Sequence, residues 1–177
     1  MISSTPILSI VIPTYEMKGK GVFFLERCIA SIEKQTGIER AQFEVVISDQ
    51  SSDQAIASFC QNHAFPVQYH HTSTGRGIAA HNLNVAISLA NGQYIKILFQ
   101  DDILVEANYL ATILGIITHK NPQCILTKAS HTKDGEHFFN AITPADNPYL
   151  LFGNNTVSSP SVITASKKLL ELLPFDE

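Results

Sequence analysis

The adjacent carboxylates Asp101 and Asp102 are the side chains of this sequence best suited to chemistry. They follow an apolar, strand-like run over residues 94–99. Two neighbouring carboxylates at the end of a buried strand repel each other unless a cation or hydrogen-bond donors compensate. Carboxylate oxygens suit Mg²⁺ or Mn²⁺, which bind one or two carboxylates together with substrate phosphates. The pair therefore indicates a site for a divalent cation and phosphate, with a helix cap ahead of Glu106 as the structural alternative.

Three other polar turns follow predicted strands, at residues 13–16, 49–53 and 75–77. The carboxyl ends of parallel strands meet at one edge of a sheet, where the ligands of α/β proteins bind. Any one of these turns could be polar simply because loops are exposed to water. Together with the acidic pair they make four polar turns, which favours a shared binding site.

The elements that must position these turns alternate along the chain. Apolar and β-branched runs predict strands, and apolar residues at helical spacing predict the helices between them. The predicted strands cover residues 7–12, 43–48, 66–70 and 94–99, and the predicted helices cover residues 23–37, 53–63 and 75–90. Asp53 is expected to cap the second helix, and Asn91-Gly92 to end the third in the left-handed conformation. The alternation predicts an α/β fold, in which helices cover both faces of a mostly parallel, Rossmann-like sheet.

The chain is less regular beyond Pro122. Here the pattern predicts a strand at 124–129, a polar turn at 133–135, a loop at 143–155, a strand at 157–164 and a short helix at 166–172. We find no internal repeat and no second domain boundary, so residues 1–177 are expected to form one domain.

The composition is that of an ordinary soluble globule, with 45% hydrophobic and 16% charged residues among 177. A net charge of −4 with scattered Lys and Arg gives no footprint for nucleic acid. Three widely separated cysteines are typical of reduced residues in a cytoplasmic protein. No apolar run reaches the roughly 18 residues of a membrane span. We therefore expect a cytoplasmic location, and only sequence outside this chain could hold it at a membrane surface.

Three ordered stretches of the chain resemble the family 2 glycosyltransferases, which have the GT-A fold. They are residues 8–15 (LSIVIPTY), residues 44–53 (EVVISDQSSD) and residues 76–102, where Arg76 and Asn82 lead to the sequence LFQDD. Their order and spacing match the family, and the resemblance covers nearly the whole chain. It implies a GT-A sheet, and transfer of a sugar from a nucleoside diphosphate sugar to an acceptor hydroxyl with Mn²⁺ or Mg²⁺ as cofactor.

The resemblance implies that the first two turns bind the nucleotide. Pro13 belongs to this set, and Thr14 and Tyr15 would lie against the nucleobase. Asp49 would accept a hydrogen bond from the base, which favours the ring imide of uracil or thymine. A UDP-sugar is therefore the first expectation and a dTDP-sugar the second.

The same resemblance implies that the remaining turns bind the phosphates and the metal. Arg76 would face the diphosphate or the base, Asp101 the ribose and Asp102 the divalent cation. The implied acceptor is a glycan or a lipid-linked sugar, and surface polysaccharide synthesis is the implied setting.

Two features depart from the family pattern. Phe99 stands where many members carry an Asp, so one polar contact to the nucleotide is absent or supplied otherwise. Residues 174–177 resemble the segment just before the family's Glu-Asp motif, which supplies the catalytic base. The catalytic residue is therefore unknown, and its base is expected beyond Glu177. Residues 1–177 would then be a nucleotide-sugar-binding domain that lacks its C-terminal acceptor part and transfers poorly alone.

Two other interpretations compete with a transferase. Residues 75–80 match the G-x-G-x-x-A form of a dinucleotide fingerprint, with Asp101 about 20 residues further on, which would suit an NAD(P)-binding oxidoreductase. That fingerprint normally follows the first strand of its fold, and here it follows the third. A non-catalytic nucleotide-sugar-binding fragment is the other alternative, favoured by Phe99 and the missing base.

Overall fold

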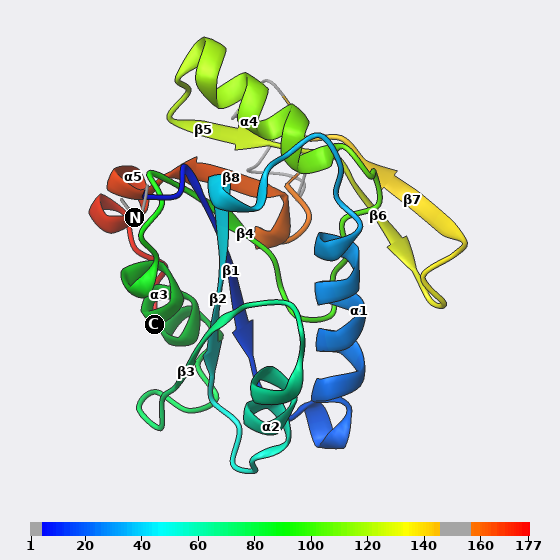
Figure 1. The fold of residues 1–177 in the computed structure, drawn as a ribbon, viewed down its shortest axis with the longest axis vertical. Coiled ribbons are helices and arrows are strands. Elements are labelled where there is room, and N and C mark those ends of the chain that lie inside the picture. Colours follow the sequence, from blue (N-terminus) through cyan, green and yellow to red (C-terminus); the bar gives the residue numbers. More distant parts are fainter. Residues whose placement is uncertain (1–4, 146–156) are drawn as a thin grey trace.

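The computed structural model describes residues 5–145 and 157–177. Its main sheet has six strands in the order β3-β2-β1-β4-β8-β5 (Figure 1). These strands are β1 (Leu8–Thr14), β2 (Phe43–Asp49), β3 (Gln68–His71), β4 (Tyr94–Ile97), β5 (Cys124–Leu126) and β8 (Ile163–Ser166). The first four strands are mutually parallel, and β8 runs antiparallel between β4 and β5. The predicted α/β fold with a mostly parallel sheet is confirmed.

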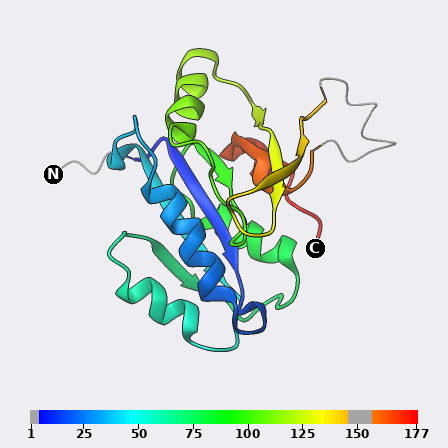
Figure 2. The ribbon, with the colours of Figure 1, turned by 90° about the vertical axis from the view of Figure 1, so that its right-hand side faces the viewer.

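Helices cover both faces of this sheet, as the two views show (Figures 1 and 2). They are α1 (Gly21–Glu33), α2 (Ala55–Asn62), α3 (Ala79–Leu89), α4 (Tyr109–Lys120) and α5 (Lys167–Leu172). The side chains of β1 point alternately to the two faces of the sheet. Ile10 and Ile12 pack with α1, α2 and α4, while Val11 packs with α3 and α5. All three side chains are fully buried, which explains the continuous apolar run of this central strand.

Short 3₁₀ segments and one hairpin complete the described elements. The 3₁₀ segments are η1 (Met17–Gly19), η2 (Arg40–Gln42) and η4 (Pro160–Val162). A separate hairpin of β6 (Ala129–Thr132) and β7 (Phe138–Ile142) lies beside α1. In residues 5–145 and 157–177, no helix is long and apolar enough to cross a membrane.

A buried carboxylate, that of Glu44, links several segments by hydrogen bonds at the end of the sheet where the parallel strands begin. Glu44 is 8% exposed and accepts hydrogen bonds from the Ser9 hydroxyl (2.6 Å), the Asn91 backbone N–H (2.5 Å) and the Asn91 side-chain amide (3.1 Å). The Gly92 N–H (3.3 Å) and the Gln68 amide also donate to it. These donors come from β1, β3 and the turn before β4, so one side chain joins four segments.

The predicted left-handed end of the third helix is wrong. Helix α3 ends at Leu89, and Ala90 is extended with φ −69° and ψ 143°. Neither Asn91 nor Gly92 is among the residues with positive φ. A Cβ on Gly92 would instead lie 2.6 Å from the Ser9 Oγ, so this position requires glycine because two backbones approach closely there.

Several predicted boundaries shift. Gln54, and not Asp53, is the N-cap of α2, although the Asp53 Oδ1 still accepts from the Ala55 N–H at 3.0 Å. Helix α3 begins at Ala79, because residues 75–77 form a turn with positive φ at both glycines. Strand β4 ends at Ile97, two residues before its predicted end.

The region after α4 differs most from prediction. The predicted strand at 124–129 is split between β5 and β6, which belong to different sheets. Strand β7 was not predicted, and the polar turn at 133–135 joins it to β6. Only residues 163–164 of the strand predicted at 157–164 belong to a strand, because η4 precedes β8. The helix predicted at 166–172 is confirmed as α5, and most of the predicted loop at 143–155 lies outside the described residues.

Candidate functional site

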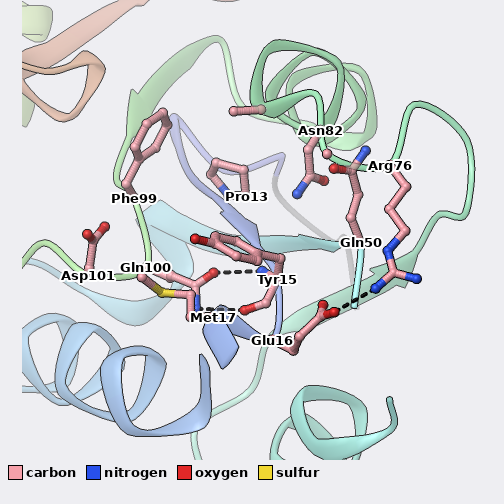
Figure 3. A pocket seen from close by; sticks show the side chains of 12 residues that line it. Pro13, Tyr15, Glu16, Met17, Gln50, Arg76, Asn82, Phe99, Gln100 and Asp101 are labelled. Carbon is pink, nitrogen blue, oxygen red and sulfur yellow. Dashed lines mark hydrogen bonds and ion pairs between the residues drawn. The ribbon is translucent and has the colours of Figure 1, made fainter. Parts of the chain in front are cut away.

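A pocket of about 770 Å³ opens at the carboxyl ends of β1, β2 and β4 (Figure 3). Parts of all four predicted turns line it, although they are as far apart in sequence as 13 and 101. Its lining residues are Pro13, Tyr15, Glu16, Met17, Gln50, Arg76, Gly77, Ala79, Asn82, Phe99, Gln100 and Asp101. The structure therefore brings together Pro13, Tyr15, Arg76 and Asp101 of the predicted nucleotide-binding residues.

Gln100 holds the turn after β1 in place. Its Oε1 accepts from the Tyr15 backbone N–H at 2.7 Å, and its Nε2 donates to the carbonyls of Tyr15 (3.1 Å) and Gly21 (3.3 Å). Gln100 is 3% exposed, whereas Tyr15 is 52% exposed. The Tyr15 backbone is thus fixed while its ring stays open to the pocket (Figure 3).

Thr14 and Asp49 lie behind the pocket wall and are fully buried. The Asp49 Oδ1 accepts from the Ser51 hydroxyl at 2.6 Å, the Ser51 N–H at 2.9 Å and the Thr14 hydroxyl at 3.3 Å. Its Oδ2 accepts from the Tyr69 hydroxyl at 2.8 Å, and burial together with this bond raises the pKa of Tyr69. In this structure Asp49 shapes the turn after β2, and its contact with a nucleobase stays a prediction.

Arg76 forms an ion pair with Glu16 across the mouth of the pocket, with an Nη2–Oε1 distance of 2.6 Å (Figure 3). The Ser52 hydroxyl also donates to Glu16 at 2.9 Å. Hydrogen bonds from the backbone of Glu16 and from Ser52, with the charge of Arg76, lower the pKa of Glu16 against its partial burial. The Gln50 amide donates to the Gly75 carbonyl at 2.9 Å and so holds the Arg76 turn from below.

Asp101 and Asp102 occupy different environments. Asp101 is exposed and lines the pocket, whereas Asp102 is partly buried. Burial raises the pKa of Asp102, and the neighbouring charge of Asp101 raises it further. Hydrogen bonds from Ser161 and Ser159 and the charge of Lys96 offset part of this rise. The repulsion predicted for the adjacent pair is therefore present, and nearby donors compensate it only in part.

The residues around Asp102 fit a divalent cation that completes its shell with substrate oxygens. Within residues 5–145 and 157–177, no group of three or more His, Cys, Asp or Glu side chains could hold a metal by itself. Mg²⁺ usually takes one or two carboxylates together with phosphates and waters, and does not need a cage made of protein. A partly buried carboxylate whose pKa is raised by desolvation gains from a nearby cation, which suits Mn²⁺ or Mg²⁺ at Asp102.

Several lining residues had not been assigned a role from the sequence. Gln50, Gln100 and Met17 lie in or beside the predicted turns, and the side-chain hydrogen bonds of Gln50 and Gln100 go to residues far away in the chain. Asn82, which belongs to the resembling stretches, donates to the Thr14 carbonyl at 2.9 Å. Its Oδ1 is buried and has no hydrogen-bond partner within the described residues. The adjacency of Gln100 to the acidic pair was the one local signal for this set.

The dinucleotide interpretation does not fit the topology. The turn at 75–77 follows β3, a four-residue strand at the edge of the sheet. Ile78 separates this turn from the first residue of α3, and its backbone is extended, with φ −103° and ψ 100°. A dinucleotide site would lie instead at the turn after the first, central strand, and here that turn carries Tyr15 and Glu16.

Comparison with known proteins agrees with this geometry. GlyG, a glycosyltransferase of Streptococcus pneumoniae, is 29% identical over 139 residues, which are 75% of this chain and 43% of GlyG. The structure of S. aureus TarS in complex with UDP is similar in fold, with a TM-score of 0.69 and 20% identity over 93% of this chain and 48% of that chain. The mannosyltransferase PcManGT of Pyrobaculum calidifontis, solved with GDP-Man and Mn²⁺, has a TM-score of 0.63 and 20% identity over 98% of this chain and 48% of that chain.

The chain thus spans less than half of the length of each of these proteins. The sequence profile described as Glycosyl transferase family 2 matches residues 9–165. This match covers the sheet, the pocket and the acidic pair, and it confirms the resemblance of the motifs and the predicted GT-A fold. The chain belongs to glycosyl transferase family 2.

Proposed function

We propose that this chain binds a nucleoside diphosphate sugar, a UDP-sugar first of all, for transfer of the sugar to a hydroxyl of a glycan or lipid-linked acceptor. The observation that carries the proposal is the pocket at the carboxyl ends of the parallel strands, which is lined by the open ring of Tyr15, the guanidinium of Arg76 and the carboxylate of Asp101. This position is the one at which α/β sheets bind nucleotides. TarS, a structural neighbour, was solved with UDP.

In this proposal the nucleobase stacks on the ring of Tyr15. A planar nucleobase stacks on an apolar face, and the Tyr15 ring is half-exposed. The Gln100 Oε1 holds the backbone of Tyr15 by accepting from its N–H at 2.7 Å. Pro13 and Met17 line the same region of the pocket. Because the backbone is held before ligand arrives, stacking costs little conformational entropy.

Arg76 is the group proposed for the diphosphate. Its guanidinium is half-exposed and already lies in the pocket, where it is paired with Glu16. A diphosphate carries more negative charge than one carboxylate and offers oxygens for bidentate bonds. Arg76 would therefore exchange Glu16 for the ligand, while Asp101 would accept from the ribose.

Asp102 is proposed to hold Mn²⁺ or Mg²⁺. When bound, such a cation neutralises the charge that develops on the departing nucleoside diphosphate. The neighbour PcManGT was solved with Mn²⁺ and GDP-Man, which supports a metal in this fold. The catalytic base, which takes the proton of the acceptor hydroxyl, is proposed to lie beyond Glu177. The proposed setting is surface polysaccharide synthesis on the cytoplasmic side.

A thermal-shift panel tests the proposal. UDP, dTDP, GDP and NADH are each added with and without Mn²⁺ to the wild type, to Asp102→Ala and to the matched control Glu106→Ala, an exposed carboxylate four residues further on. A ligand at about 100 times its Kd adds about 2.7 kcal/mol of stability, or roughly 5–11 °C in a chain of this size. We expect the UDP shift to need Mn²⁺ in the wild type and the control, and to vanish in Asp102→Ala.

Each other outcome has a defined meaning. A metal-dependent shift that survives in Asp102→Ala would show that the metal ligand is misassigned. A shift with NADH and none with any nucleoside diphosphate would contradict the proposed donor and favour the dinucleotide alternative.

A further inference from the structure

A second, smaller pocket lies between α1 and the β6–β7 hairpin. Its volume is about 80 Å³, and its lining residues are Phe24, Arg27, Asp101, Ile103, Thr132, Lys133 and Gly135. It shares Asp101 with the large pocket, so the two pockets are adjacent at this residue. A liquid water occupies about 30 Å³, so the small pocket has room for roughly two or three waters or one compact ionic group.

Arg27 and Lys133 place two positive charges in the wall of this pocket, and Asp101 places one negative charge there. Among residues 5–145 and 157–177, neither cation forms an ion pair, either with Asp101 in the same wall or with any other carboxylate. Arg27 donates to the Asp134 backbone carbonyl at 2.9 Å and lies over the Phe23 ring at 5.6 Å. These neutral contacts orient the guanidinium but leave its charge without a carboxylate partner.

The hairpin turn contains two acids, Asp134 and Glu136, and neither forms an ion pair with Arg27. Asp134 accepts from the backbone N–H groups of Glu136 and His137, both at 2.9 Å, and from the Thr132 hydroxyl at 3.1 Å. These bonds, with one from the His137 ring, lower the pKa of Asp134 and hold its carboxylate within its own turn. The turn therefore offers Arg27 a backbone carbonyl, while donors within the turn stabilise the charge of the Asp134 carboxylate.

The hairpin approaches Arg27 closely at Gly135, whose backbone conformation favours glycine. A Cβ on Gly135 would lie 1.7 Å from the Arg27 Nη2, and Gly135 has a φ of +84°. The guanidinium thus lies against the hairpin, where its hydrogen bond to the Asp134 carbonyl orients it. An oriented planar donor next to a lysine is the arrangement that recognises carboxylate or phosphate oxygens.

We propose that this pocket binds an anionic group, a phosphate or a carboxylate, carried by the acceptor substrate. The proposal rests on the proposed transfer function and narrows its acceptor to an anionic molecule. The pocket is too small for a sugar ring, but it shares a wall with the donor pocket. An acceptor anchored there by its charge would present a neighbouring hydroxyl toward the donor sugar.

The test is a titration of the 177-residue chain with methyl phosphate, followed by nuclear magnetic resonance. Arg27→Gln and Lys133→Gln remove the two charges, and Lys128→Gln is the matched control because Lys128 is exposed and outside both pockets. We expect saturable shifts at Lys133, Gly135 and the Arg27 side-chain N–H. Each charge-removing variant should weaken binding by roughly tenfold, and the control should not.

A second arm separates this site from the donor pocket. Methyl phosphate should still bind at Arg27 when UDP and Mn²⁺ are saturating. Displacement of the probe by UDP, or equal binding in Arg27→Gln, Lys133→Gln and Lys128→Gln, would overturn the proposal. Loss of UDP binding with the Arg27 shifts retained would instead contradict the proposed donor function and leave the anion site standing.

Discussion

Glu44 lies at the sheet edge opposite the pocket, and its removal should destabilise the whole sheet. In Glu44→Ala the Ser9 hydroxyl, which is fully buried, and the Asn91 and Gly92 N–H groups lose their common acceptor. A buried donor left without a partner costs about 1–3 kcal/mol, and Gly92 keeps a second acceptor in the Ser9 Oγ at 2.8 Å. We therefore expect a loss of about 3 kcal/mol, or roughly 6–12 °C in melting temperature.

Glu44→Gln isolates the contribution of the charge. The amide oxygen can still accept from Ser9, but the new NH₂ group would face the donating amides of Gln68 and Asn91. We expect a loss of about 2 kcal/mol at pH 7, smaller than that of the alanine variant. The matched control is Glu26→Gln, an exposed glutamate on α1, which should change stability by less than about 0.5 kcal/mol.

The pH dependence of this loss gives the sharper test. Burial is the largest single influence and raises the pKa of Glu44, but the hydrogen bonds from Ser9, Asn91 and Gly92 together outweigh it and lower the pKa. A carboxyl whose pKa is lower in the folded state stabilises the protein above its unfolded pKa, about 4.3, and loses that effect as the pH falls through the folded pKa.

Urea unfolding between pH 7 and pH 3.5 measures the effect. The stability gap between the wild type and Glu44→Gln should be complete at pH 6–7 and shrink below about pH 4. A gap that stays constant over this range would refute the assigned role of the charge. A cost below about 1 kcal/mol for Glu44→Ala would refute the role of the network itself.

Two further changes test the contacts of the large pocket by calorimetric titration with UDP and Mn²⁺. Glu16→Gln releases Arg76 from an ion pair that is partly exposed, so it should raise UDP affinity by roughly twofold to fivefold, and unchanged or weaker binding would contradict the exchange of partners. Gln100→Ala removes three hydrogen bonds to Tyr15 and Gly21, so it should weaken UDP binding by roughly tenfold and lower the melting temperature, and normal affinity would show that Tyr15 needs no clamp.

The core strands of the fold could be predicted because their signals are local. The run ending at Ile12 is apolar on both faces, and β1 is buried between two helical layers. The acidic pair marked the end of a strand from the sequence alone, and it lies in the pocket wall through Asp101. Spacing of residues along one segment was sufficient for these features.

Other features depend on partners far away in the chain. Asp49 reads as an exposed turn residue, but Tyr69, Thr14 and Ser51 enclose it. The clamp between Gln100 and Tyr15 joins residues 85 positions apart. Strand β7 is exposed at four of its five residues and, in the part of the chain that the structure describes, pairs with β6 alone, so its sequence carries no burial signal. Tertiary contacts decide such features, and no local pattern encodes them.

The acids at the two ends of the sheet differ in how the protein stabilises their charge, and the difference indicates which of them has a structural role and which a role in binding. At one end, protein donors satisfy Glu44 so fully that its pKa is lowered despite burial. At the other end, hydrogen bonds from Ser161 and Ser159 and the charge of Lys96 lower the pKa of Asp102, but burial and the charge of Asp101 outweigh them and keep it raised. A fold that needed Asp102 only for stability would gain from more donors or from an apolar side chain. An acid left short of compensating charge at the ligand edge of a sheet is instead what a cation-binding role requires, which supports the proposed metal at Asp102.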